Sequence, residues 1–329
     1  MRRNIKIMNN STVVKIIIAT FFIFQRPVFS ETKPSTGNVS KNNIASFSNP
    51  FASTSIWNKK ISANTNYVDV QDAIWGDSTQ APNTLYTDLV GVYYVDNSQP
   101  LVNFRLNQGW NYPERSKPRG EVLFQKKIAL EDGTEFKSPK NGNGNFVIID
   151  LQTGIAVEGS AGWRESGGDF LMFENNEKFN QNIDVINGNG LVGTGGSGLP
   201  VLGGLITQGE LNSGVNHAVA VALSSRRYSK DVFYVWPATR NDSFASNSLY
   251  GYLGNNSNYT MGTLLAIPND FNLDSVTWKT IQGKNLAKAA QTYGWYIVDS
   301  GTGEAGGNIM AFGIERKAAS VDLGMIIDS

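Results

Sequence analysis

The sequence predicts a mainly β fold, a sandwich or jelly-roll of antiparallel sheets with one or a few short helices near the C-terminus. Short candidate strands recur along the chain, and turn clusters rich in Gly, Asn, Ser and Pro separate them. Blocks of the helix-favouring residues Glu, Lys and Ala are scarce, whereas 34 of the 329 residues are glycine. A chain of this length can bury a sizeable core.

Residues 1–30 have the features of a secretory signal peptide. Arg2 and Arg3 precede an apolar run from Val13 to Phe24, and small or tolerated side chains lead up to Ser30. The apolar run is shorter than a comfortable membrane span, so we expect cleavage near Ser30 rather than an uncleaved anchor. The protein is then expected to be secreted or periplasmic, with no membrane association after cleavage.

The composition excludes several kinds of site. The chain has no cysteine, which rules out disulfides, thiolate nucleophiles and cysteine metal ligands, and an exported protein without cysteine is more usual in bacteria than in animals. The 28 Lys and Arg residues balance 28 Asp and Glu, and no basic stripe predicts nucleic-acid binding. With a single histidine and no calcium-loop motif, we expect no metal and no other cofactor.

The mature chain is expected to begin with a flexible linker, residues 31–46, because this stretch is polar and has no apolar periodicity. Residues 47–329 are expected to form a single β-rich domain, in which Trp57 is a packing anchor. Alternating or apolar runs predict strands over Val90–Asp96, Leu101–Leu106, Glu121–Lys127, Asn145–Leu151, Ile155–Glu158, Asp169–Glu174, His217–Leu223, Val232–Trp236, Met261–Ile267 and Trp295–Asp299.

One helix is predicted between the last two of these strands. Leu286, Ala289, Ala290 and Tyr293 recur at helical spacing, and Gly294 is a plausible stop. The helix is expected to pack against a sheet, which makes the fold β-rich with a minor helical element.

The stretch Gly198–Leu223 holds the only histidine of the chain. A glycine-punctuated loop leads to Glu210, a polar turn follows, and His217 opens an alternating run that predicts a strand. Binding and catalytic groups often lie at such junctions. The alternative is a buried histidine that hydrogen-bonds the backbone, because His217 shares its face with apolar residues.

Acidic residues around this stretch suggest glycoside hydrolysis, for which a pair of carboxylates is the minimum apparatus. The candidate catalytic residues are Glu158, Glu210 and His217, expected to line one cleft. The candidate substrate-binding residues are Trp163, Arg164, Asp169, Asn216 and Tyr234, and the expected partner is a polysaccharide or oligosaccharide. A tryptophan beside acids can stack on a sugar ring, although most tryptophans of β-rich chains are core.

Two other functions stay open. A polysaccharide lyase would use His217 as base, Arg164, Arg226 or Arg227 to neutralise a uronate, and Tyr228 or Tyr234 as acid. A non-catalytic carbohydrate-binding or cell-surface protein would instead expose aromatic side chains without converging titratable groups.

The loop Gly193–Gly198 lacks the ending of a phosphate loop and is interpreted as a flexible surface loop. A serine hydrolase is disfavoured because the chain has no Gly-x-Ser-x-Gly elbow.

Several motifs resemble those of a family of largely uncharacterised secreted microbial proteins. The family's stretch reads roughly GLPxLxGLxxxxE followed by GxxHA, and the matching residues here run from Gly198 through Glu210 and Gly214 to His217-Ala218. The likeness continues in order through Asn49-Pro-Phe51, Ile56-Trp-Asn58, Tyr234-Val-Trp-Pro-Ala238, Met261-Gly262 and Ala290-Gln-Thr-Tyr-Gly294 to Asp299-Ser-Gly301. The resemblance implies a secreted single-domain β-rich protein and no particular reaction. Asn216 stands where the family has a basic residue, and the arginine that follows the His-Ala pair there is absent.

Overall fold

The computed structural model describes residues 17–19, 49–69, 84–95, 98, 100–127, 136–137, 143–164, 168–175, 183–301 and 309–324. Strand, at 33%, is more than twice as frequent as helix, at 15%, which confirms the mainly β class. The predicted linker, residues 31–46, lies outside the described residues. So does the predicted signal peptide apart from three residues.

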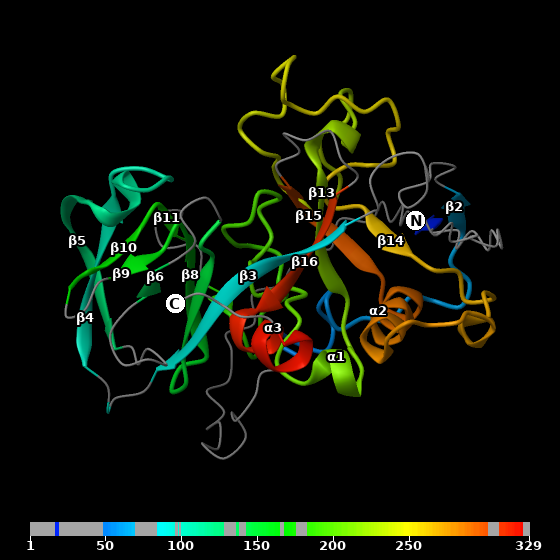
Figure 1. The fold of residues 1–329 in the computed structure, drawn as a ribbon, viewed down its shortest axis with the longest axis horizontal. Helices are drawn as coiled ribbons and strands as arrows, with labels where there is room; N and C mark the ends of the chain where they lie inside the picture. Colours follow the sequence, from blue (N-terminus) through cyan, green and yellow to red (C-terminus); the bar gives the residue numbers. More distant parts are fainter. Residues whose placement is uncertain are drawn as a thin grey trace, which may run out of the picture.

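The described strands form two sheets (Figure 1). The larger has the order β11 (Glu174–Asn175), β8 (Ile155–Ser160), β7 (Phe146–Asp150), β3 (Thr84–Val95), β16 (Ile309–Glu315), β13 (Val219–Ser224), β15 (Trp295–Gly301), β14 (Leu264–Ala266), β1 (Ile17–Ala19) and β2 (Tyr67–Asp69), with β12 (Ile183–Asp184) paired to β8. The smaller has the order β5 (Pro118–Lys127), β4 (Leu101–Asn107), β10 (Phe170–Met172), β9 (Trp163–Arg164) and β6 (Phe136–Lys137).

Strand pairing is mixed in both sheets, whereas the sequence predicts antiparallel sheets. In the larger sheet β16 and β7 each run parallel to β3, and β13 runs parallel to β15. In the smaller sheet β10 runs parallel to β4. Parallel pairs need long connections between their strands. Periodicity within one strand does not reveal which distant strand becomes its neighbour.

Strand β13 shows how the alternating sequence builds two cores. Val219, Val221 and Leu223 face one side, where they pack in a core with residues of the helices α1 (Glu210–Ser213), α2 (Ile281–Thr292) and α3 (Arg316–Leu323). Ala218 and Ala220 face the other side, in a core with Trp57 and Leu202. Position 204 must be glycine here, because a Cβ on Gly204 would lie 2.5 Å from the amide nitrogen of Ala220.

Trp57 is the packing anchor that the sequence predicts. Its side chain is fully buried, and its indole nitrogen donates to the carbonyl of Gly190 at 2.8 Å. A Cβ added at Gly190, Gly203 or Gly204 would lie within 2.6 Å of the indole ring, so the glycines of this loop are required by the ring.

The smaller sheet packs on the end of the larger one as a local sandwich. Phe104 and Phe170 of the smaller sheet share a core with Phe146 and Ile148 of β7. The rings of Phe104 and Phe170 stack with centroids 4.8 Å apart. Strand β3 joins the two regions, since its first half pairs with β16 and its second half with β7 (Figure 1).

The predicted helix is confirmed as α2, and it begins where a capping residue stands. Thr280 accepts a hydrogen bond from the amide of Gly283, and Gly294, with φ at 85°, follows the last turn. Most predicted strands are confirmed with small changes in their ends. The segment Val232–Trp236 makes only an isolated bridge, between Tyr234 and Met261. Strand β16 and helix α3 were not predicted.

Among the described residues, no helix combines the length and the apolar character that crossing a membrane requires.

Candidate functional site

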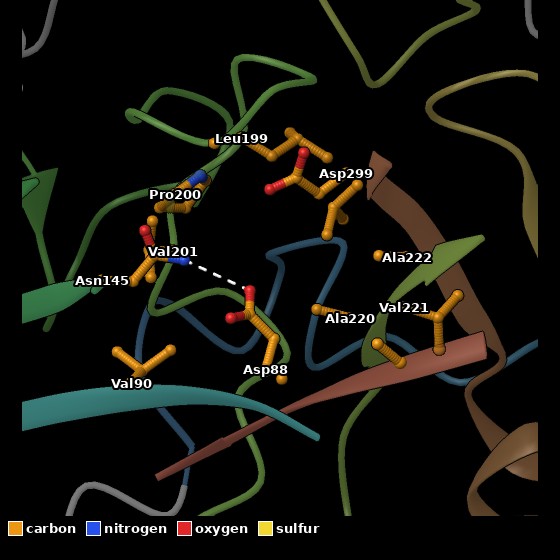
Figure 2. A pocket seen from close by; sticks show the side chains of 14 residues that line it. Asp88, Val90, Asn145, Leu199, Pro200, Val201, Ala220, Val221, Ala222 and Asp299 are labelled. Carbon is orange, nitrogen blue, oxygen red and sulfur yellow. Dashed lines mark hydrogen bonds between the residues drawn. The ribbon is translucent and has the colours of Figure 1, made fainter. Parts of the chain in front are cut away.

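A small pocket lies on the face of the larger sheet opposite the helices, and the space in it that can hold the centres of water-sized molecules is about 40 Å³. Two carboxyl groups line it, Asp88 from β3 and Asp299 from β15. Figure 2 shows both side chains pointing into the space between them. Neither residue was singled out from the sequence as a catalytic candidate.

Asp88 is held by two amide side chains. Asn143 and Asn145 each donate from Nδ2 to Oδ2 of Asp88, at 3.2 Å. Both bonds fall on one oxygen, Oδ2. Burial raises the pKa of Asp88 to about 6, and the two asparagine donors oppose this rise by stabilising the carboxylate.

Asp299 reaches the pocket because β15 contains a β-bulge. Ile297 pairs with Val221 and Asp299 pairs with Ala222, so Val298 has no partner on β13. The extra residue shifts the alternation, and Val298 and Asp299 both line the pocket. Without the bulge, Asp299 would share the face of Ile297, which lies in the helix-covered core.

Three charged neighbours act on Asp299. Burial raises its pKa well above the usual range, and the negative charges of Asp242 and Asp88 raise it further. The amide of Ser300, which donates to Oδ1 at 2.8 Å, and the charge of Arg240 act in the opposite direction. Burial and two negative neighbours therefore favour a proton on Asp299, whereas the pKa of Asp88 is raised only to about 6.

The pocket floor between the two aspartates is made of small residues. Strands β16 and β13 lie between β3 and β15 and contribute Ala311, Gly313, Ala220 and Ala222. Larger side chains at these positions would fill the space above the sheet. The run Ala218-Val-Ala-Val-Ala222 in the sequence thus supplies both a core face and an open floor.

The wall of the pocket is the loop that includes Gly195 and Leu199–Val201. The sequence interpretation of Gly193–Gly198 as a flexible surface loop is wrong: Gly193, Ser197 and Gly198 are buried. A Cβ at Gly193 would lie 2.1 Å from Cα of Pro200, so the chain folds back on itself here. Arg240 fastens the outer side, donating from Nη2 to the carbonyls of Thr194 and Gly195 at 2.9 Å each.

Glu158 supports this loop from below. Its side chain is fully buried, with Oε1 accepting from the amide of Thr194 at 2.7 Å and Oε2 accepting from the amides of Val201 at 2.9 Å and Leu202 at 3.4 Å. Burial raises the pKa of Glu158 to about 7 against these hydrogen bonds. The predicted catalytic glutamate therefore holds the pocket wall in place.

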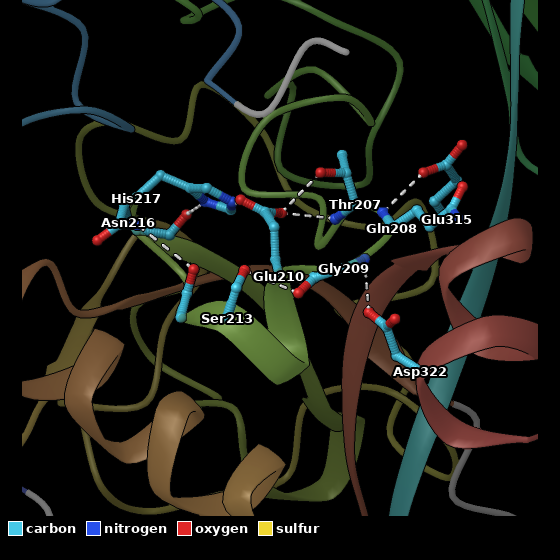
Figure 3. A network of polar contacts seen from close by, with 11 residues as sticks. Thr207, Gln208, Gly209, Glu210, Ser213, Asn216, His217, Glu315 and Asp322 are labelled. Atoms are coloured by element: carbon cyan, nitrogen blue, oxygen red, sulfur yellow. Dashed lines mark hydrogen bonds and ion pairs between the residues drawn. The ribbon is translucent and has the colours of Figure 1, made fainter.

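Glu210 and His217 form a buried pair in a different network (Figure 3). Nε2 of His217 lies 3.2 Å from Oε2 of Glu210, and its Nδ1 donates to the carbonyl of Ala218 at 2.8 Å. Oε2 of Glu210 also accepts from the amide and the hydroxyl of Thr207. Both ring nitrogens are hydrogen-bonded and His217 is only 2% exposed. The structure thus matches the alternative that the sequence left open, a buried histidine that hydrogen-bonds the backbone.

The loop of residues 207–209, which Glu210 contacts at Thr207, is also held by two other carboxylates. The amide of Gln208 donates to Glu315 at 3.1 Å, and the amide of Gly209 donates to Asp322 at 2.9 Å. Consecutive amides of residues 207–209 thus each meet a carboxylate from a different element (Figure 3). The structure joins Glu210 to His217 but keeps this pair apart from the network of Glu158, so the three residues do not line one cleft.

The predicted substrate-binding residues are dispersed. Trp163 and Arg164 lie in β9 of the smaller sheet and are 6% and 8% exposed, which leaves little surface for a ligand. Asp169 lies beside them and accepts hydrogen bonds from Arg105 and Asn103. Asn216 is exposed next to the buried histidine, and Tyr234 is 44% exposed on the loop that follows β13.

Burial pushes the pKa of Arg164 down, and the charge of Asp169 opposes this effect.

Sequence reasoning missed Asp88 and Asp299, although one signal could have found them. Each is an acid within an otherwise apolar or aromatic strand, where an unpaired charge is costly and needs a reason.

Among the described residues, no group of three or more His, Asp or Glu side chains could hold a metal ion. Comparisons with family models, with curated proteins and with solved structures gave no match.

Proposed function

We propose that the protein is a secreted enzyme that hydrolyses glycosidic bonds in an extracellular polysaccharide, with Asp299 as general acid and Asp88 as general base. The observation that supports this most is a pair of carboxyl groups on opposite sides of one pocket, with pKa values raised to different extents. Such a separation assigns an acid and a base at a single pH. The paired carboxylates expected from the sequence are thus replaced by different residues.

The reaction follows from these two protonation states. Above about pH 6 Asp88 is ionised and can take a proton from a water molecule, whose oxygen attacks the anomeric carbon. The bond between that carbon and the glycosidic oxygen breaks, and the leaving oxygen takes the proton of Asp299. The rate is therefore expected to rise through about pH 6 and to fall where Asp299 loses its proton.

The strand order favours inversion at the anomeric carbon. Two strands separate β3 from β15, so three strand spacings, about 14 Å in a flat sheet, lie between their backbones. Side chains that reach toward each other across the sheet bring the two carboxyls closer together than their backbones, and inverting glycosidases hold their carboxyls roughly 6.5 to 9.5 Å apart against roughly 5 Å in retaining ones. We expect the first product to have the inverted configuration.

Exposed aromatic residues support a saccharide ligand and also keep the non-catalytic alternative open. Trp236 is 62% exposed and Tyr234 is 44% exposed on one extended segment, close in sequence to Arg240 at the pocket wall. Flat exposed rings are suitable surfaces for sugar stacking. A binding protein would need these rings but would not need the two carboxyls.

The lyase alternative has less support. It requires His217 to reach a substrate proton, yet the ring is buried and both of its nitrogens are hydrogen-bonded. Tyr228, one of the acids considered for that reaction, is fully buried, and its hydroxyl donates to the backbone carbonyl of Asp299.

The test is incubation of the mature protein with a panel of neutral and uronate polysaccharides. Reducing ends and the absorbance of unsaturated uronate are followed together, and the anomer formed first is identified by NMR. Asp88→Asn and Asp299→Asn are each expected to lower turnover by about 10²-fold or more. Asp231→Asn, at an exposed aspartate, is the control for loss of a carboxylate.

Three results would contradict the proposal. Full activity in both pocket variants would remove the assigned roles. Unsaturated products would indicate a lyase. Binding to a polysaccharide without any cleavage would favour the non-catalytic alternative.

A further inference from the structure

A third carboxyl, that of Asp242, lies directly beside Asp299 although it does not line the pocket. A Cβ placed on Gly196 would be 2.7 Å from Oδ1 of Asp242 and 2.7 Å from Oδ1 of Asp299. The two oxygens therefore lie within twice that distance of each other. Only a glycine leaves room for both carboxyls at this point.

The other oxygen of Asp242 is fixed by two hydroxyl groups. Oδ2 accepts from Oγ of Ser300 at 2.6 Å and from the phenol of Tyr252 at 2.9 Å. The backbone amide of Ser300 donates to Oδ1 of Asp299 at 2.8 Å. Ser300 thus contacts both carboxyls and sets their relative position, and Asp242 cannot swing away from Asp299 without losing these bonds.

The remaining charged groups that act on Asp299 are of both signs. Asp88 adds a second negative charge across the pocket, and Arg240 supplies the positive charge. The guanidinium of Arg240 donates hydrogen bonds to loop carbonyls. Tyr228 reaches the backbone carbonyl of Asp299 and not its carboxyl, and burial raises the pKa of this phenol well above its usual value.

We propose that Asp242 is a positioning residue that keeps the proton on Asp299 by holding a fixed negative charge next to it. The proposal rests on the role of Asp299 as general acid. Two carboxylates so close in a partly desolvated site cannot both ionise easily. Burial raises the pKa of Asp242 as well, but the hydroxyls of Ser300 and Tyr252 and the positive charge of Arg240 favour its charged form. Because these two hydroxyls donate to Asp242, the proton of the pair resides on Asp299, where the substrate can receive it. Asp299 would thus act with two other carboxyls. Asp88 is the general base on the opposite side of the pocket, and Asp242 is the residue that keeps Asp299 protonated.

Asp242→Asn tests this inference because asparagine keeps the size of the side chain and an acceptor for the two hydroxyls. Its amide would replace a negative charge with a donor beside Asp299. We expect the pKa of Asp299 to fall by about 1 to 3. In the pH profile of kcat/KM the alkaline limb should move to lower pH by the same amount, while the rate at the acid end changes less.

The titration of Asp299 is measured by NMR of ¹³C-labelled carboxyl groups, assigned with Asp299→Asn, so the result does not depend on enzymatic activity. Asp231→Asn is the matched control and should leave the titration unchanged. If Asp242→Asn does not fold, Asp242→Ser removes the same charge and should shift the titration in the same direction.

An unchanged titration of Asp299 in the folded variant would overturn the inference, even if the protein is an active hydrolase. A uniform loss of kcat/KM at all pH values, with no movement of the alkaline limb, would also overturn it, because a merely structural role predicts that result. A lowered pKa in a protein that cleaves no polysaccharide would support the coupling of the two carboxyls and would refute the proposed function alone.

Discussion

Glu158→Gln separates two opposing effects on one buried carboxyl. Removal from water favours the neutral acid, whereas the amides of Thr194, Val201 and Leu202 favour the carboxylate. The larger of these effects is burial, so the pKa is raised from 4.5 to about 7. The pocket wall is thus held by a group whose charge state changes near neutral pH.

The sign of the resulting pH dependence follows from linkage. The folded-state pKa lies above the unfolded one, so the contribution of Glu158 to stability is fully present below about pH 4.5 and is lost as the pH rises through about 7. The difference between these two pKa values corresponds to about 3 kcal/mol. A glutamine side chain does not titrate, so the Glu158→Gln variant lacks this pH-dependent contribution to stability.

Glutamine also has a cost that does not depend on pH. Its amide group must face either Thr194 or the amides of Val201 and Leu202, and each unpaired buried donor costs about 1 to 3 kcal/mol. We therefore expect the stability of the variant, relative to that of the wild type, to improve by about 3 kcal/mol between about pH 5 and about pH 8.

The assay is urea unfolding followed by tryptophan fluorescence at several pH values across this range. Glu114→Gln, at an exposed glutamate whose side chain is 50% accessible, is the matched control and should show no comparable trend. A relative stability of Glu158→Gln that is constant, or that worsens as the pH rises, would refute the reasoning. It would mean that the three amides outweigh burial and that Glu158 is already ionised in the folded protein at about pH 5.

Two further variants test the buried pair and the exposed rings. The hydrogen bonds of His217 to Glu210 and Ala218 outweigh burial and raise its pKa, so its stabilisation is present below about pH 6.5 and is lost as the pH rises through the raised value. His217→Gln should therefore cost about 3 kcal/mol or more at acid pH and less at alkaline pH, as measured by urea unfolding; an equal cost at both would refute the pairing. Trp236→Ala should weaken polysaccharide binding about two- to tenfold in a pull-down assay, whereas Leu249→Ala, at an exposed apolar residue, should not; equal losses would argue against ring stacking.

The fold could be predicted as far as local patterns determine it. The alternation after His217 gives β13, the helical spacing before Tyr293 gives α2, and Trp57 is the anchor that its sequence context indicates. The parallel pairing of β13 with β15 could not be predicted, because it depends on a connection of about seventy residues and on packing that no local pattern encodes.

The candidate site could be predicted only in part for a similar reason. Glu158 was selected as one of the acids considered together with His217, but its partners are 36 to 44 residues away and make it a support of the pocket wall instead of a catalytic residue. His217 and Glu210 are seven residues apart and do meet, yet burial withdraws both from a ligand. Their short separation in the sequence predicted that His217 and Glu210 meet, but it did not predict that both side chains are buried.

The pocket exists because a β-bulge in β15 coincides with small side chains on the neighbouring strands β13 and β16. Regular alternation in β15 would place Asp299 among the apolar residues under the helices, where its proton could not reach a substrate. The bulge at Val298 turns it to the opposite face, at the level of Ala222, and the small residues of β13 and β16 leave that face open as far as Asp88. Since Gly196 is the point at which the loop clears both Asp242 and Asp299, the same loop that closes the pocket also allows the acid to have its charged neighbour. Glycine in this loop is therefore required for the proposed chemistry as well as for the fold.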